Sequence, residues 1–415
     1  IYDEVKYLLL ILSSFFMRIV GQFINVLFFG LFFINPLYNQ SDNIKNIQLF
    51  GSITNTQKSI FYKDEIIRVS FDELSFKTNN YYYSLDHFDF EWNKSNIFKN
   101  EVISGYDDIR ISDHEKSFNT LQKFTRYSFS FPNEKFNIKL SGNFILSVMD
   151  SDENTIFKRR FIIVENLNPG VIDISRPKNL TKRNSFQNLK IKFRCINCFF
   201  DSRSEYKLVV IQNNNLNSYR SIEKTTLRTT NELIFDDILF EGDDEYYSFD
   251  TKNILGTNNE IRQSIPDNIY STILYEDFQN LNYTYKPDKN GVFINNSLND
   301  DNNLESDYTN VTFSLRTTSS ENNNIYVIGG FNDYETNEKY MLQKAGNNLY
   351  TKTIKLKQGY YNYKYVKTEN GNTQNLSNFW QTENNYSAFL YQKKPTDRFY
   401  KIVGYTTKNS DKIVN

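Results

Sequence analysis

Histidine is the side chain on which most acid–base sites depend, and this chain of 415 residues has only two. His87 lies in an aromatic stretch between Asp86 and Asp89, and His114 lies in a charged loop. A Ser–His–Asp or Cys–His system needs one of these imidazoles as its base, yet neither accompanies a nucleophile motif such as G-x-S-x-G. Two histidines are also too few for a three-histidine zinc site. We therefore expect both to be structural or solvated, and we predict no catalytic residue.

The two cysteines, Cys195 and Cys198, form a single C-x-x-C motif. One such pair supplies half of a four-cysteine zinc site, and the sequence contains no second half. A redox pair would begin a helix after a strand, whereas the neighbours Phe193, Phe199 and Phe200 favour a strand or a tight loop. In an oxidising compartment the thiols either close a small disulfide or stay reduced. We predict a non-catalytic pair, with no metal and no cofactor.

Carboxylates gather in four places, which are the remaining candidates for a metal or an acid–base site. The clusters are Asp107 and Asp108; Asp236 and Asp237; Asp243, Asp244 and Glu245; and Asp300 and Asp301. Charged turns are usually solvated, and we interpret all four clusters in this way. A further set alternates as calcium ligands would, namely Asp301, Asn303, Glu305 and Asp307. It lacks the glycine and the closing glutamate of a 12-residue calcium loop. A pair of glycosidase carboxylates far apart in sequence stays an open alternative, although no feature favours it.

Short strands are the elements that must position these residues. Apolar side chains alternate with polar ones over 67–71 and 127–131, which is the period of a strand with one buried face. Aromatic residues alternate with polar ones over 360–366 in the same way. Many short strands separated by turns are typical of β-sandwiches. The sequence therefore predicts an all-β protein of tandem immunoglobulin-like or early-set sandwich domains.

Turn residues and composition suggest where these domains end. A first sandwich is expected over 44–166, because Asn168, Pro169 and Gly170 follow it as a turn signal. A middle sandwich is expected over 171–290. The polar, acidic stretch over 295–307 reads as a linker or a long loop, and a C-terminal early-set-like sandwich is expected over 308–409.

Residues 1–40 read as a leader. Met17, one basic residue, an apolar run over 19–34 and a polar exit before Ser41 make the pattern of a secretory signal peptide. The alternative is a transmembrane helix, which needs about 20 apolar residues. Residues 1–16 lack an initiator methionine and are interpreted as upstream sequence. We expect an exported chain whose mature part begins near Ser41.

Composition excludes one class of partner. The net charge is −1, whereas a nucleic-acid-binding protein shows a basic excess or a basic stripe. Phe and Tyr together account for 66 residues, 36 and 30 respectively, which favours strands over helices. The sequence contains neither a P-loop nor a G-x-G-x-x-G motif, so no nucleotide site is predicted.

The stretch from Phe118 to Leu146 resembles the signature of a protein family found in Bacteroidetes. This family consists of the plug proteins of the type IX secretion system. The stretch contains PheAsnThrLeuGlnLysPheThrArgTyrSerPheSerPheProAsnGlu and, further on, LysLeuSerGlyAsnPheIleLeu. Other residues that resemble the family are Tyr81, Tyr82, Tyr83, His87, Glu91, Trp92, Ser95, Asn96, Gly105, Tyr106 and Asp113, with the ranges 159–165, 326–330, 357–366, 382–385 and 398–405. The resemblance thus spans about 44–408 and is most specific between residues 118 and 146.

The resemblance implies a non-enzymatic subunit in the periplasm. Members of the family bind the periplasmic opening of the outer-membrane β-barrel translocon of the type IX system and seal it between substrates. The expected partner is therefore this barrel, with no nucleic acid and no small-molecule substrate, and the expected location is the inner face of the outer membrane.

A second hypothesis concerns the C-terminal sandwich, which also resembles glycogen-binding domains. The stretch from Tyr326 to Tyr334 and the aromatic run over 360–366 carry this resemblance. In sugar-binding members a tryptophan stacks on the ring where this chain has Tyr334, and Trp380 is a second aromatic candidate. The alternative function is an exported carbohydrate-binding protein.

Overall fold

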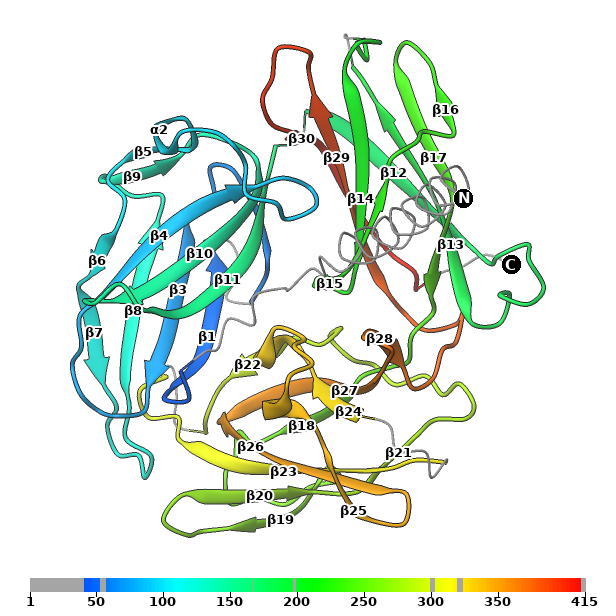
Figure 1. Cartoon of the computed structure of the whole chain (residues 1–415). Helices are drawn as coiled ribbons and strands as arrows, with labels where there is room; N and C mark the ends of the chain where they lie inside the picture. The colour runs from blue at the N-terminus through cyan, green and yellow to red at the C-terminus, as the bar shows by residue number, and fades with distance from the viewer. Residues whose placement is uncertain are drawn as a thin grey trace, which may run out of the picture. The chain divides into compact units, whose positions relative to one another are not determined.

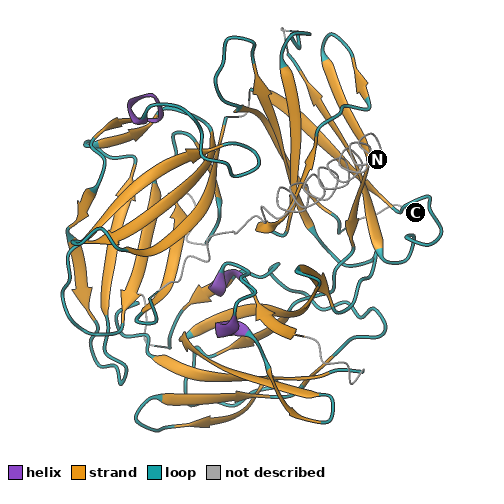
Figure 2. Ribbon diagram, viewed as in Figure 1, coloured by secondary structure: helices purple, strands orange, loops and turns teal. Residues whose placement is uncertain are grey.

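Strands make up nearly all of the regular structure in the computed structural model of the chain (Figures 1 and 2). The structure describes residues 41–52, 57–165, 167–196, 199–298, 303–318 and 324–411. The predicted leader over 1–40 lies outside these ranges, and residues 40–415 form a compact unit of their own. The predicted all-β sandwich fold is confirmed. Within the described ranges, no helix is long and apolar enough to cross a membrane.

The first sandwich contains the strands from β1 to β11. One sheet has the order β1 (Ile44–Gly51), β3 (Ile67–Glu73), β8 (Thr125–Phe131) and β7 (Asp113–Lys116). The other has the order β2 (Ile60–Tyr62), β11 (Thr155–Val164), β10 (Gly142–Asp150), β4 (Tyr81–Phe88) and β6 (Ile109–Ile111). A short helix, α2 (Lys99–Val102), leads into β5 (Ile103–Gly105), which pairs with β9 (Phe136–Ile138).

The inward positions of these two sheets form an aromatic core. Phe71 of β3 stacks on Tyr127 of β8, with ring centroids 5.1 Å apart. Phe144 of β10 stacks on Phe161 of β11 at 5.5 Å. All four side chains are buried. Burying each large apolar side chain contributes about 1.5–3 kcal/mol, so the predicted alternation of apolar residues is the main source of stability here.

The second sandwich is built from one continuous path of strands. Their order is β15 (Asn215–Ile222), β14 (Glu205–Gln212), β29 (Asn385–Lys393), β30 (Lys401–Asn409), β12 (Asn168–Ser175), β13 (Phe186–Arg194), β17 (Glu232–Glu241) and β16 (Leu227–Arg228). β12 joins the two halves, because Asn168 and Pro169 pair with β30 whereas its later residues pair with β13. Buried residues from both halves, such as Phe193 and Tyr386, form a common core between them.

The third sandwich surrounds a long central strand, β27 (Gly359–Glu369). β27 pairs with β18 (Tyr247–Asp250), β22 (Phe293–Asn295), β24 (Asn324–Ile328) and β28 (Asn372–Asn375). The facing sheet has the order β19 (Ile261–Ile265), β20 (Tyr270–Leu274), β23 (Tyr308–Arg316), β26 (Leu349–Lys357) and β25 (Gln343–Gly346), with β21 (Asp277–Phe278) also on β23. Two 3-10 helices are η1 (Gly330–Asn332) and η2 (Glu338–Tyr340). Phe313 and Tyr363 meet in the core with ring centroids 4.9 Å apart.

Strand pairing divides the second and third sandwiches differently from the expected boundaries at 171–290 and 308–409. β29 and β30 lie beyond residue 308 yet pair with β14 and β12. β18 to β22 lie before residue 308 yet pair with β20, β23 and β27. The third sandwich is therefore inserted between β17 and β29. The sequence patterns identify strands but not their partners, because pairing joins residues that are far apart in the chain.

The expected linker over 295–307 is also more structured than its composition suggested. Its first residue, Asn295, ends β22. Leu304 and Asp307 are buried near its other end. Asn295, Leu304 and Asp307 contact residues of the first sandwich, as described below. Asp300 and Asp301 lie outside the described residues.

Candidate functional site

His87 is a buried structural residue. Its Nε2 lies 3.2 Å from the carbonyl oxygen of Ser141, and its Nδ1 lies 2.8 Å from Oγ of Ser95. A carbonyl only accepts, so Nε2 carries the proton and Nδ1 accepts from the serine hydroxyl. Burial lowers the pKa of His87 to about 4. The ring therefore stays neutral at neutral pH and fixes the loop that contains Ser95 to strand β4.

The surroundings of His114 and Cys195 are also those of structural residues. His114 is exposed in β7, stacks on Tyr127 at 5.7 Å and lies 3.0 Å from the carbonyl oxygen of Ser112. Cys195 is disulfide-bonded and almost fully buried. Cys198 lies outside the described residues.

The carboxylate clusters differ in their surroundings. Asp107 is exposed and pairs with Lys99 at 2.9 Å, as expected of a surface turn. Asp236 pairs with Lys190 at 3.5 Å, but it lies within strand β17 and not in a turn. The expectation of a solvated turn is wrong for the cluster that begins at Asp243, because Asp243 and Glu245 are buried. No group of three or more metal-ligating side chains is present in the part of the chain that the structure describes.

Asp307, the last member of the calcium-like series, serves a different purpose. Its carboxylate accepts hydrogen bonds from the backbone N–H groups of Leu121 and Gln122, at 2.5 and 3.0 Å. It also accepts from the backbone N–H of Tyr308 at 2.8 Å. Three backbone donors satisfy this carboxylate, which therefore joins the first sandwich to the start of β23.

Tyr334 and Trp380 are not placed to stack on a sugar. The side chain of Tyr334 is buried, and its hydroxyl donates toward the carbonyl oxygens of Asn213 and Asn290, at 3.3 and 3.1 Å. The ring of Trp380 is covered by the guanidinium of Arg176, whose carbon lies 4.1 Å from the ring centroid. A sugar ring needs an open aromatic face, which Tyr334 does not offer, and at Trp380 the guanidinium of Arg176 already occupies one position over the ring.

The junction between the first and third sandwiches is built around a buried ion pair (Asp72–Lys357). Nζ of Lys357 lies 2.7 Å from Oδ2 of Asp72, and both side chains are fully buried. The same oxygen accepts from the hydroxyl of Tyr308 at 2.7 Å. The ammonium of Lys357 also lies 3.8 Å from the ring centroid of Phe124. Asp72 and Phe124 come from the first sandwich, whereas Lys357 and Tyr308 come from the third.

This junction contains the most specific part of the predicted family signature. Phe124 is the last residue of the PheAsnThrLeuGlnLysPhe segment, and its ring meets that of Tyr308 edge to face at 5.6 Å. The backbone N–H of Phe118 donates to the carbonyl oxygen of Leu304. Phe124, Leu304 and Tyr308 form a small apolar cluster of their own. The segment thus docks the first sandwich on the third.

An apolar cluster joins the first sandwich to the second. Ile60, Phe90, Ile162 and Val164 of the first pack with Val209, Ile211, Leu216, Phe389, Tyr391 and Ile402 of the second. At its centre the hydroxyl of Tyr391 donates to Oδ1 of Asn143 at 2.6 Å. Oγ of Ser141 donates to the carbonyl oxygen of Ile402 at 3.1 Å. Buried apolar contact with satisfied polar groups is the pattern of a permanent interface.

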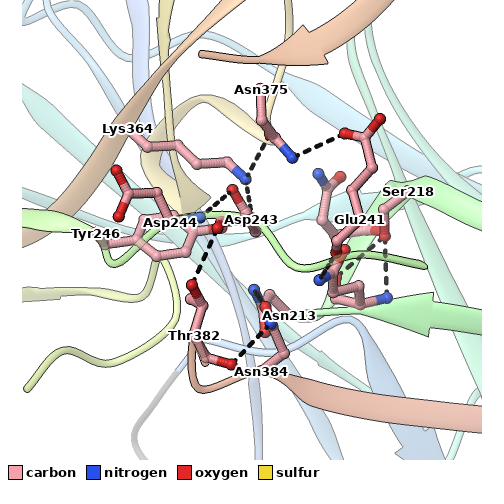
Figure 3. A network of polar contacts seen from close by, with 12 residues as sticks. Asn213, Ser218, Glu241, Asp243, Asp244, Tyr246, Lys364, Asn375, Thr382 and Asn384 are labelled. Carbon is pink, nitrogen blue, oxygen red and sulfur yellow. Dashed lines mark hydrogen bonds and ion pairs between the residues drawn. The ribbon is translucent and has the colours of Figure 1, made fainter. Parts of the chain in front are cut away.

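A polar network spans the place where the chain leaves the second sandwich and returns to it (Figure 3). Asp243, on the connection from β17 to β18, forms an ion pair with Lys364 of β27. Its carbonyl oxygen accepts from Thr382 at 3.0 Å. Nearby, Nδ2 of Asn213 donates to Oδ1 of Asn384 at 2.8 Å. Both connections to the inserted sandwich are thereby held together.

Carboxyl groups beside this network have raised pKa values. Burial raises the pKa of Glu245 to about 7, against the lowering effect of a hydrogen bond from Tyr283. Burial likewise raises the pKa of Asp288 to about 6, opposed by backbone hydrogen bonds from Asn290 and Tyr246. Such values indicate groups that exchange protons near neutral pH.

Two of the best-defined pockets in the described part of the chain are too small for an organic ligand. One, beside Asp244 and Lys364, has a volume of about 20 Å³, and another, beside Arg159 and Tyr334, about 40 Å³. Small-molecule sites usually have roughly 300–1,000 Å³. A third, open hollow of about 390 Å³ lies over Tyr206 and Arg228. It is lined mainly by charged side chains at the surface.

Comparison with known proteins gives a family for the first sandwich. Residues 44–165 match the family model described as type 9 secretion system plug protein 1st domain. A hypothetical protein from Parabacteroides merdae, solved at 2.30 Å resolution, has a similar structure with a TM-score of 0.83. It is 23% identical, and the alignment covers 89% of this chain and 98% of that one, so the likeness shows the fold alone. The comparison with curated proteins found no match. The plug signature docked at a buried junction thus lies within a stretch, residues 44–165, that matches the first domain of the plug proteins of the type IX secretion system.

Proposed function

We propose that this protein is the periplasmic plug that binds the periplasmic opening of the type IX outer-membrane translocon and seals it between substrates. The observation that carries the proposal is the match of residues 44–165 to the plug family. The family is one of secretion components and not of enzymes, which agrees with the neutral, buried state of His87. A wide aqueous channel would leak small solutes, so an idle translocon needs a seal.

The way the sandwiches are joined supports a sealing role. A seal must keep its shape against a moving partner, and preformed surfaces avoid the ordering cost that flexible segments incur at each binding event. Here a buried ion pair, an apolar cluster and a polar network hold the three sandwiches together. The plug therefore meets the barrel as one body.

The proposed location rests on the leader that the sequence predicts over 1–40. We propose that the leader over 1–40 exports the chain and that the mature protein, from about Ser41, acts in the periplasm on the inner face of the outer membrane. N-terminal sequencing of the periplasmic fraction tests this. A chain that keeps the 19–34 segment and stays in washed membranes would contradict it.

Two measurements test the plug function. First, the tagged chain should co-purify the translocon barrel from envelope membranes. Second, deletion of the gene should admit large antibiotics that the outer membrane normally excludes, and this leak should disappear when the barrel is deleted as well. The proposal is wrong if the deletion strain shows no leak and the purified barrel does not bind the protein.

A further inference from the structure

A loop on the third sandwich presents apolar side chains to solvent. It runs over 275–289, which we call the strap, and includes β21. Its exposed apolar side chains are Tyr275, Phe278, Leu281 and Tyr285, with exposed fractions of 50, 59, 68 and 62%. Lys286 and Lys289 are exposed beside them. An exposed group of this kind needs an explanation, because large apolar side chains are normally covered.

The carboxylates of the strap all have partners from other parts of the fold. Glu276 pairs with Arg316; Asp277 accepts from the hydroxyls of Tyr363 and Tyr365, both at 2.8 Å; and Asp288 accepts from the backbone N–H of Tyr246 at 2.6 Å. None of the three is classed as exposed, whereas both lysines are. The outer surface of the strap is therefore apolar and cationic.

A second cationic segment lies on the second sandwich, between β12 and β13. Residues 176–184, the basic loop, contain Arg176, Lys178, Lys182 and Arg183 and no carboxylate. Leu180, at the middle of the loop, has an exposed fraction of 79%. For a chain whose net charge is −1, four cations within eight residues are a strong local concentration.

Two aromatic residues connect the basic loop to the strap. The backbone N–H of Trp380 donates to the carbonyl oxygen of Asn184 at 3.1 Å, and Arg176 covers the indole ring. The neighbouring Phe379 meets the ring of Tyr283 in the strap, with centroids 5.9 Å apart. The two cationic segments are thus connected through adjacent residues, although about 100 residues separate them in sequence.

We propose that the strap and the basic loop together dock on the surface of an anionic lipid bilayer. The cations match anionic headgroups, and the exposed leucine, phenylalanine and tyrosine side chains suit the boundary between headgroups and acyl chains. Three of the six cations are exposed lysines, a residue depleted in protein–protein interfaces but suited to a lipid surface because its stem can extend along apolar groups. The contact would keep a plug against the membrane while it is off the barrel.

Vesicle sedimentation tests this docking. Residues 40–415 are mixed with vesicles of phosphatidylcholine alone or with about 30% phosphatidylglycerol, whose headgroup is anionic. We expect binding to the anionic vesicles only, and weaker binding as salt rises from about 0.1 M to about 0.5 M. The variant K178E/R183E should lower the affinity by roughly tenfold or more, since each charge near the surface contributes about one kcal/mol. The variant F278S/L281S should also lower it.

Matched substitutions on the first sandwich serve as controls. K77E/K135E reverses two exposed charges, as K178E/R183E does. F98S/Y106S removes two apolar side chains that are 71 and 74% exposed, and so matches F278S/L281S. Both should bind anionic vesicles like the unaltered chain, and thermal melting should show all variants folded. Equal loss in test and control variants, or no binding to either vesicle, would overturn the proposal. The proposal would also be overturned if the test variants bound vesicles like the unaltered chain but no longer bound the purified barrel. That result would make this face a protein-docking surface. Because the vesicles contain no barrel, failure here leaves the proposed plug function untouched.

Discussion

Replacing Lys357 by methionine should show how strongly the first and third sandwiches are joined. Methionine keeps much of the side-chain volume but removes the ammonium that lies 2.7 Å from Oδ2 of Asp72. Both side chains are fully buried, so water cannot replace the lost partner. The hydroxyl of Tyr308 remains as a donor at 2.7 Å, and the guanidinium of Arg126 lies 4.0 Å from Oδ1. Leaving a buried charge without its main partner costs about 3–5 kcal/mol.

The assay is urea unfolding of residues 40–415, followed by intrinsic fluorescence, with Lys357→Met, Asp72→Leu and the double variant compared. Each single variant should lower the free energy of unfolding by about 3–5 kcal/mol, whereas the double variant should lose much less, because a buried ion pair is often replaced by apolar groups at little cost. Lys355→Met, a neighbour whose ammonium is partly exposed and bonds Gln122 at 2.8 Å, is the control and should cost about 1 kcal/mol or less. Losses that simply add in the double variant would refute the coupling argued here.

Two other predictions concern the junction of the second and third sandwiches. Because burial raises the pKa of Glu245 to about 7 and of Asp288 to about 6, above their ordinary values of 4.5 and 3.8, the folded chain holds protons that the unfolded chain releases. The free energy of unfolding should therefore fall as pH rises from about 4 to about 7, and Glu245→Gln should flatten the upper part of this dependence in urea titrations at several pH values. Tyr334→Phe removes a hydroxyl that is bonded to two carbonyl oxygens and should cost about 1 kcal/mol in thermal melts. Neither form should be retarded in glycogen gels, and retardation that depends on Tyr334 would contradict the buried position described here.

Local patterns predicted the strands well and their partners poorly. The alternation over 67–71 and 127–131 predicted β3 and β8, and their apolar residues are buried except Phe129, which is half-buried. In β27 the same alternation predicted polar residues on an outer face, yet Asn362 and Lys364 are buried too. Lys364 is covered because it faces Asp243 at the junction with the second sandwich. The alternation of residues in a sequence indicates that a segment is a strand. It does not show whether the second face of that strand is buried, because that depends on contact with a neighbouring domain.

The residues that hold the junctions had no visible signal as site residues. Asp72 is one of several polar residues that alternate with apolar ones in β3, and its role depends on Lys357, which lies 285 positions further along the chain. Asp307 looked like part of a calcium-ligand series, because the spacing of carboxylates cannot distinguish a cation from a set of backbone N–H donors. The family signature near Phe124 was visible in the sequence, and the structure gives it a physical role as a docking segment.

The sandwiches differ in how many chain connections join them. The inserted third sandwich is connected to the second by two chain crossings, and the network of Asp243, Lys364 and Asn384 closes around both. The first sandwich is connected by the single passage from β11 to β12. Its orientation therefore depends on side chains, above all on Asp72 and its partners. Opening that junction would break the ion pair of Asp72 with Lys357 and expose the apolar cluster of Phe124, Leu304 and Tyr308 to water, and exposing apolar side chains is costly. If the protein acts as the plug proposed above, it should leave the channel by moving as one body, and release should come from competition at its outer surfaces and not from separation of its sandwiches.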